Sequence, residues 1–270
     1  MMRVAVLMVA MTTATPTTAQ QAPPQAPVRP MPRPETAVTA PVPAPAAPPQ
    51  AVDNTGTVAA PPTATATKGQ RDLLQLNDAT YASCLVALRD LAVVYEEVAA
   101  VVPDDDADCG ILQPVKVSQI APGIALVPPA VVRCPTAKAL AGWVQDFVLP
   151  AAARLDGRGA LTAIENGSGY TCRRRNNEVD GALSEHAFGN AFDVMGFRFE
   201  LGSPVMVGPG KSEDGLASVF QDAVWASACL DFATVLGPGS NASHEDHLHL
   251  DIKARENGFR TCELGAAVDE

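Results

Sequence analysis

"GALSEHAFGNAFDVMGF", residues 181–197, places His186 and Asp193 seven positions apart, with Gly189 between them. The stretch "AFDVMGFRF", residues 191–199, is apolar enough to predict a buried strand. Glycine at 189 permits a tight reversal of the chain ahead of that strand. Such a turn brings an imidazole and a carboxylate together, and both are ligands that zinc accepts.

A second histidine patch, "SHEDHLHLD" at 243–251, contains the other three of the four histidines in the chain. A strand over 246–254 has a period of two, which puts His247, His249 and Asp251 on one face. The opposite face carries the apolar residues Leu248, Leu250 and Ile252. We therefore expect the leucines to be buried while the imidazoles line a cleft, and the two patches to form one metal site. The alternative for any single histidine is an ordinary hydrogen-bonded surface or core residue.

The rest of the chain mixes helical and strand patterns. Apolar spacing predicts helices over 77–100, 135–155 and 213–230, the first with an N-cap at Asn77 or Asp78 and the second opened by Pro135. Proline and glycine divide 109–134 into short strands, and 159–172 reads as a strand that enters a loop. Because no βαβ unit repeats, the pattern favours an α+β fold with a small antiparallel sheet and flanking helices.

The first 70 residues differ in composition from the rest. Arg3, the apolar run 4–11 and the small residues before Ala19 predict a signal peptide over 1–19. The run is too short to span a bilayer, so no integral membrane span is expected after the signal is removed. Residues 20–70 are rich in proline and alanine and predict a disordered linker. We expect the folded domain over 71–270, exported to the periplasm or cell envelope of a bacterium.

Cysteine usage and charge narrow the function further. No CxxC pair occurs, so a thiolate metal site is unsupported. An even number of widely spaced cysteines after an export signal predicts three disulfides, whose pairing the sequence leaves open. The six residues are Cys84, Cys109, Cys134, Cys172, Cys229 and Cys262. A net charge of −11 argues against nucleic acid as a partner. We also expect the protein to be a monomer.

The histidine patches also carry a resemblance. "SEHAFGNAFD" matches S-x-H-x-x-G-x-A-x-D and "HEDHLH" matches H-x-x-H-x-H, two signatures of zinc D-Ala-D-Ala carboxypeptidases and murein endopeptidases. With "SGYTCR" at 168–173, the longer pattern over about 78–265 resembles the bacterial extensin-like C-terminal domain family. The resemblance implies the architecture shared by these zinc peptidases and hedgehog domains.

The same resemblance implies roles for individual residues. His186, Asp193 and His249 would bind Zn²⁺, and Asp246 would be the general base. In an ideal strand Asp246 points away from His249, so this role needs a bend before the strand, and Glu245 is the fallback base. His247 would stabilise the transition state and Arg173 would hold the substrate. Ser184, His244 and Asp251 would lie behind the ligands, where Ser184 and Asp251 would orient the ligand imidazoles by hydrogen bonds.

Together these expectations describe a peptidase. Zinc lowers the pKa of a bound water to about 7, and Asp246 would pass a proton from it to the leaving amine. Peptidoglycan stem peptides are the expected substrate, cut by carboxypeptidase or endopeptidase action. The alternative is a cell-envelope binding module that keeps the metal site without catalysis, as the resemblance to hedgehog domains allows. An open, water-filled coordination position with a carboxylate within reach would favour the enzyme, and a closed site would favour the binding module.

Overall fold

The computed structural model describes residues 68–104, 106–208 and 215–263. The expected signal peptide and all but the last three residues of the expected linker lie outside these ranges. In the described ranges, no helix has both the length and the apolar character needed to cross a membrane.

Helices and strands alternate irregularly along the chain. The α-helices are α1 (Gln70–Leu73), α2 (Asp78–Asp90), α3 (Cys134–Trp143), α4 (Leu149–Ala152) and α5 (Gly215–Asp231), with a π turn at Val144–Val148 between α3 and α4. The strands are β1 (Val94–Glu97), β2 (Pro114–Ala121), β3 (Ile124–Arg133), β4 (Leu161–Ser168), β5 (Ala191–Phe199), β6 (Val205–Met206), β7 (Thr234–Leu236), β8 (Leu248–Asp251) and β9 (Thr261–Glu263). Short 3-10 turns are η2 (Arg175–Asn177), η3 (Glu185–Phe188), η4 (Ala242–His244) and η5 (Glu256–Gly258).

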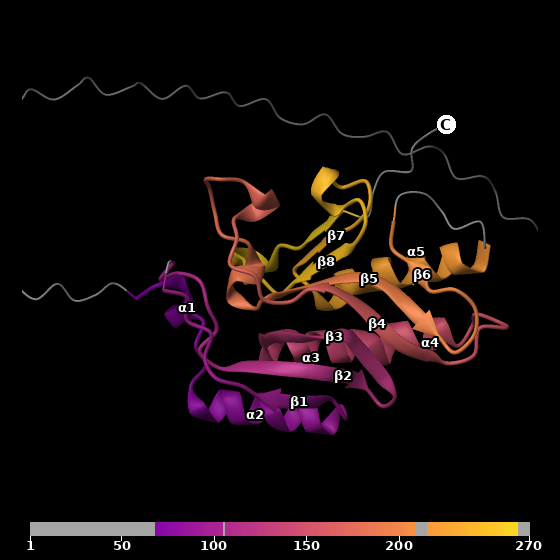
Figure 1. The fold of residues 1–270 in the computed structure, drawn as a ribbon, viewed down its shortest axis with the longest axis horizontal. Helices are drawn as coiled ribbons and strands as arrows, with labels where there is room; N and C mark the ends of the chain where they lie inside the picture. Colours follow the sequence, from indigo (N-terminus) through magenta and orange to yellow (C-terminus); the bar gives the residue numbers. More distant parts are fainter. Residues whose placement is uncertain (1–67, 105, 209–214, 264–270) are drawn as a thin grey trace, which may run out of the picture. The chain divides into compact units, whose positions relative to one another are not determined.

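All nine described strands belong to one sheet, in the order β1-β2-β3-β4-β5-β8-β7-β9, with β6 paired to β5 (Figure 1). The expected α+β class is confirmed, but the expected small antiparallel sheet is wrong in two respects. The sheet is large, and two of its pairs, β3 with β4 and β7 with β9, are parallel. The long connections that precede β4 and β9 allow parallel pairing, which a two-residue hairpin cannot provide.

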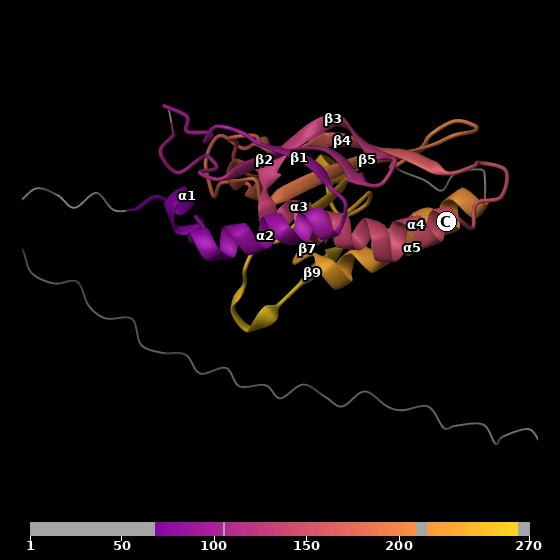
Figure 2. The same ribbon diagram turned by 90° about the horizontal axis from the view of Figure 1, so that it is seen from below.

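Helices α2, α3, α4 and α5 lie on one face of the sheet (Figure 2). Trp143 of α3 is fully buried there and packs edge-on against Phe232 after α5, with ring centroids 6.3 Å apart. Its indole Nε1 donates to the Val224 carbonyl of α5 at 3.1 Å, so burial leaves no unpaired donor. This apolar layer fixes the sheet against the helices.

Three expected elements are corrected by the structure. The expected helix over 135–155 begins at Cys134, changes to a π turn at Val144–Val148 and ends with α4 at Ala152. The first helix begins at Asp78 with Asn77 as its N-cap, as expected, but it ends at Asp90 and not at 100. Val94 and Tyr95 then form β1 against β2, because β-branched and aromatic residues favour a pleated surface. The strand over 246–254 is shorter than expected and is not the last, since β9 follows it.

Three disulfides are present, as the cysteine pattern predicts. They join Cys84 to Cys134, Cys109 to Cys172, and Cys229 to Cys262. The first ties α2 to α3, which pack against each other, and the third ties α5 to β9. The second anchors the loop that follows β4, which carries Arg173.

The alternation of β5 and β8 separates the core from the site. Phe192 and Val194 of β5 and Leu248 and Leu250 of β8 belong to the apolar core. Because successive side chains on a strand point to opposite faces, Asp193 and His249 face away from that core. The expected burial of the leucines of this strand is confirmed, and their polar neighbours meet on the other face.

Candidate metal centre

Three side chains converge on the face of the sheet opposite the helices. His186 comes from η3, Asp193 from β5 and His249 from β8, and the last two are direct partners in the β5–β8 ladder. The His186 Nε2 atom lies 3.1 Å from Asp193 Oδ1 and 3.1 Å from His249 Nδ1. The His249 Nδ1 atom lies 3.0 Å from Asp193 Oδ1, which closes a nearly equilateral triangle.

The size of this triangle fits a tetrahedral metal ion. With metal–ligand distances of about 2.0–2.1 Å, neighbouring ligands of tetrahedral zinc are about 3.3 Å apart. The observed separations of 3.0–3.1 Å are close to that value. Two imidazoles and one carboxylate are a ligand set that zinc commonly uses, although such sets also admit other divalent ions. The Cys109 and Cys172 sulfurs also lie near Asp106, but their disulfide removes them as ligands.

A backbone carbonyl fixes the orientation of the His186 ring. Its Nδ1 lies 2.6 Å from the Gly169 carbonyl oxygen, and since a carbonyl can only accept, Nδ1 must donate. The lone pair is thereby left on Nε2, the atom that faces Asp193 and His249. The ring is fully buried. A carbonyl that sets the tautomer of a histidine is a usual feature of metal sites.

His249 lies between two carboxylates. Its Nδ1 faces Asp193, and its Nε2 lies 3.4 Å from Asp251 Oδ2. Burial alone would lower the pKa of His249, but hydrogen bonds to Asp193 and Asp251 raise it to about 9. Burial likewise would raise the pKa of the Asp193 carboxyl, but the neighbouring His186 and His249 hold it well below its usual range. The metal-free site therefore holds an ionised carboxylate beside a protonated imidazole.

The residues at the two ends of η3 fix the turn that carries His186. Ser184 caps η3, and its hydroxyl accepts a hydrogen bond from the His186 backbone N–H at 3.4 Å. Gly189 ends the turn in the left-handed region at φ 65°, as its expected role requires. A Cβ at position 189 would also overlap the Ile111 side chain. Ser184 is therefore tied to the His186 backbone and not to its ring.

The bend expected before β8 is present, because the strand begins only at Leu248. The bend places the Asp246 carboxylate against the His247 ring. Asp246 itself stays outside the triangle of candidate ligands. His247 Nδ1 donates to Asp246 Oδ1 at 2.8 Å, which leaves the lone pair on Nε2. That Nε2 atom is buried, lies 3.7 Å from Asp193 Oδ1 and has no hydrogen-bond partner among the described residues. The Asp246 side chain is 73% exposed, so His247 is the group that reaches the site.

The fourth histidine lies at the edge of this group. His244 Nδ1 donates to Asn241 Oδ1 at 2.7 Å, and its ring centroid is 5.5 Å from that of His249. Burial, with the nearby His249 and His247, lowers the pKa of His244 to about 4, so its ring is neutral near pH 7. The structure thus brings all four histidines together. Glu245, the fallback base, is exposed.

A cavity of about 340 Å³ opens beside His249. Its lining includes Arg173, Arg175, Ser184, His244, Asp251 and Lys253. Within the described ranges, no hydrogen bond or ion pair engages the guanidinium of Arg173 or Arg175, whereas Arg174 donates to the Gly181 carbonyl at 2.9 Å. The cavity therefore offers two unengaged cations, Arg173 and Arg175, in the same lining as the candidate ligand His249.

The model of one protein family, described as the extensin-like protein C-terminus, matches residues 82–263. The chain belongs to this family. The matched range contains every residue of the triangle and of the cavity beside it. No curated protein and no solved structure matches the chain.

Sequence reasoning missed part of what holds the site of this extensin-like domain together. Glu185 and Asn190 are both buried next to the ligands, and Lys253 contacts Glu185. The Gly169 carbonyl could not be found by sequence because any residue type supplies a carbonyl. The available signal for Glu185 was its position between Ser184 and His186, directly before a candidate ligand.

Proposed function

We propose that this protein is an exported zinc-dependent peptidase that hydrolyses peptide bonds of peptidoglycan stem peptides. The observation that carries the proposal is the triangle of His186 Nε2, Asp193 Oδ1 and His249 Nδ1, whose sides of 3.0–3.1 Å suit a tetrahedral ion. A bound zinc ion supplies a Lewis acid that lowers the pKa of water and polarises an amide carbonyl. Three protein ligands are the number that catalytic zinc sites use.

His247 supplies the proton-transfer group in this proposal. Its Nε2 faces the triangle with a free lone pair, and its Nδ1 is held by the Asp246 carboxylate. This arrangement lets Nε2 accept a proton from the attacking water and return it to the leaving amine. Asp246, the base expected from the resemblance, then acts as a positioning residue that stabilises the protonated ring.

The cavity supports binding of an anionic group beside the scissile bond. A guanidinium recognises a carboxylate through two parallel hydrogen bonds, and Arg173 and Arg175 are both free to make them. A terminal carboxylate in this cavity would place the last amide of a peptide near the ligands. Carboxypeptidase action is therefore favoured over endopeptidase action on the stem peptide.

The test is to incubate the purified protein with muropeptides, with zinc or with a chelator, and to measure product masses. The proposal expects loss of a C-terminal amino acid that zinc supports, the chelator abolishes and His249→Ala lacks. Muropeptides unchanged in mass under every condition would exclude the peptidase. Binding of muropeptides without cleavage would establish the rival function, a cell-envelope binding module.

A further inference from the structure

A buried charged residue lies directly beside the metal ligands. Glu185 precedes His186 in η3, and its side chain is only 8% exposed. Its Oε1 accepts a hydrogen bond from Lys253 Nζ at 2.8 Å, and its Oε2 accepts one from Asn190 Nδ2 at 2.9 Å. Both carboxylate oxygens are thus occupied, and neither contacts His186, Asp193 or His249 among the described residues.

These contacts join the two segments that supply the ligands. Lys253 follows β8 by two residues, and its backbone N–H donates to Asp251 Oδ1 at 3.0 Å. Asp251 in turn faces His249 Nε2. The ion pair therefore closes a ring of contacts from His249 through Asp251, Lys253 and Glu185 to the turn that carries His186.

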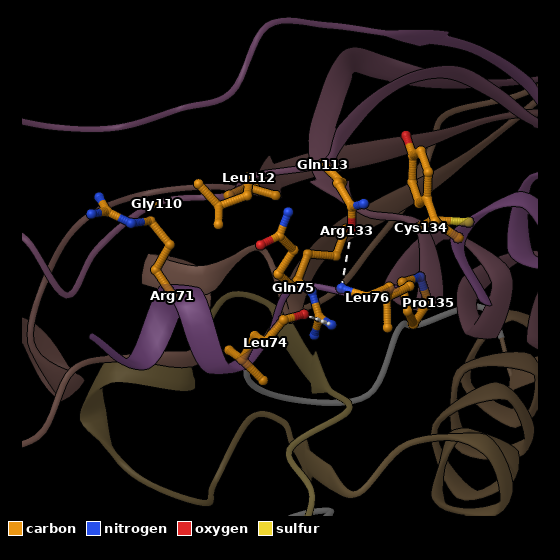
Figure 3. A pocket seen from close by; sticks show the side chains of 12 residues that line it. Arg71, Leu74, Gln75, Leu76, Gly110, Leu112, Gln113, Arg133, Cys134 and Pro135 are labelled. Carbon is orange, nitrogen blue, oxygen red and sulfur yellow. Dashed lines mark hydrogen bonds between the residues drawn. The ribbon is translucent and has the colours of Figure 1, made fainter. Parts of the chain in front are cut away.

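The network continues away from the site toward the start of the domain. Asn190 Oδ1 accepts from Arg133 Nη1, and Arg133 Nη2 donates to the Leu74 carbonyl at 2.5 Å. Figure 3 shows the Arg133 guanidinium beside the Leu74 carbonyl, among residues that follow α1. Glu185 is thus the junction between the Asn190–Arg133 contacts and the Lys253 amine.

The three ligands depend on this junction unequally. Asp193 and His249 lie opposite each other on hydrogen-bonded strands, so the ladder itself fixes their separation. His186 lies on a four-residue 3-10 turn, and short turns of this kind have weaker internal hydrogen bonding than a ladder. Leaving a buried carboxylate without its partner is strongly unfavourable. The Glu185–Lys253 ion pair therefore favours the one placement of η3, relative to the end of β8, in which the two side chains meet.

We infer that Glu185 and Lys253 form a positioning pair that sets His186 against His249 for metal binding. The inference rests on the metal site of the proposed function but not on catalysis or on the identity of the substrate. Residues that orient metal ligands from behind change metal affinity by about 10–100-fold when they are replaced. A pair with a purely structural role would change the stability of the metal-free protein and leave its zinc affinity unaltered.

The test measures zinc affinity by competition with a chelator, together with thermal unfolding of the metal-free protein. Glu185→Gln and Lys253→Met should each weaken zinc binding about 10-fold or more, while Lys253→Arg, which keeps a cationic donor, should restore most of the affinity. The double variant should be no weaker than the worse single variant, because the two residues act through one contact. A matched control is Glu165→Gln, which removes the Glu165–Arg198 ion pair of β4 and β5, with its 2.7 Å separation, and should leave zinc affinity unchanged.

The outcomes separate this inference from the proposed function. Parental protein that binds no zinc would remove the proposed function itself. Parental binding with unaltered affinity in Glu185→Gln and Lys253→Met would overturn the positioning pair alone, whatever their melting temperatures. If Glu185→Gln does not fold, Lys253→Met decides the question, since the Lys253 side chain is 33% exposed and tolerates replacement more readily.

Discussion

Asp193 and His249 face each other directly across the β5–β8 ladder, with Asp193 Oδ1 3.0 Å from His249 Nδ1. Two of the three candidate ligands are therefore placed by the sheet, and only His186 depends on a turn. In the metal-free protein this contact is a salt bridge between a carboxylate and a protonated ring, so a metal ion must displace a proton from His249 before it can bind.

Zinc affinity should therefore rise with pH. Below the His249 pKa of about 9, each zinc ion displaces one proton, so affinity should increase about tenfold per pH unit between pH 6 and 8. The stability of the metal-free protein should depend on pH in the opposite direction. Because the folded pKa exceeds the ordinary 6.5, protonated His249 stabilises the fold fully below pH 6.5, and this contribution is lost as pH rises through about 9. Chelator competition and urea unfolding at several pH values measure the two effects.

The Asp251→Asn variant provides the control for this pH dependence. Removing the carboxylate that faces His249 Nε2 should lower the pKa of that ring and shift the plateau of zinc affinity to lower pH. Zinc affinity that is flat from pH 6 to 8 in the parent, after correction for protonation of the chelator, would contradict a protonated His249.

His247 and Asp246 should affect turnover more than metal binding. His247→Ala removes the proposed proton-transfer group and should reduce kcat on muropeptides about 10²–10⁴-fold, with little change in zinc affinity. Asp246→Asn should have a smaller effect on kcat, because the His247 ring keeps its place in the site and loses only the carboxylate that positions it. Steady-state kinetics across pH measures both.

Glu245→Gln is the matched control for these variants, since Glu245 is exposed and adjacent to Asp246. It should retain parental turnover. Loss of activity in Glu245→Gln, with normal activity in His247→Ala, would reassign proton transfer to the carboxylate of Glu245.

Much of the fold follows from local sequence pattern. The strand over 191–199 and the N-cap at Asn77 are observed as predicted, and a helix is present near Pro135, although it begins one residue earlier at Cys134. Local pattern could not predict the parallel strand pairs, because strand order depends on contacts between distant segments. For the same reason it could not predict that residues 94–97 form an edge strand. Helical spacing in "LAVVYEEVAA" continues past Asp90, but the chain leaves the helix at Ala92, where φ is 53°, and pairs with β2 from Val94.

The candidate ligands were predictable for a different reason. Histidine is rare in this chain, and period-two alternation in 246–252 separates polar from apolar faces without any knowledge of the fold. The position of Asp246 was harder to predict, because the parity argument assumed that the strand includes residue 246. The strand begins two residues later, so the backbone bend and not parity decides which side chain reaches the site.

The Cys109–Cys172 disulfide should matter for the site as well as for stability. It closes a loop of 63 residues and anchors the segment that carries Arg173 and the Gly169 carbonyl. Replacing both cysteines with alanine should destabilise the protein by about 2–5 kcal/mol and should also weaken zinc binding, because the His186 ring loses a fixed acceptor. Removing the Cys229–Cys262 disulfide should cost similar stability without the loss in zinc affinity. Equal zinc affinities for the two variants would show that the Cys109–Cys172 disulfide does not support the metal site.

Gly189→Ala should destabilise the turn that holds His186. A non-glycine residue in the left-handed region costs about 1–2 kcal/mol, and the added methyl group would also press against Ile111. Because both effects move the turn, zinc affinity should fall together with the free energy of unfolding. Gly142→Ala, in α3 with open space around its Cα and a helical backbone, should be neutral or stabilising by about 0.5–1 kcal/mol. Urea unfolding with and without zinc measures both variants, and a Gly189→Ala protein with parental stability and zinc affinity would show that the turn does not depend on this glycine.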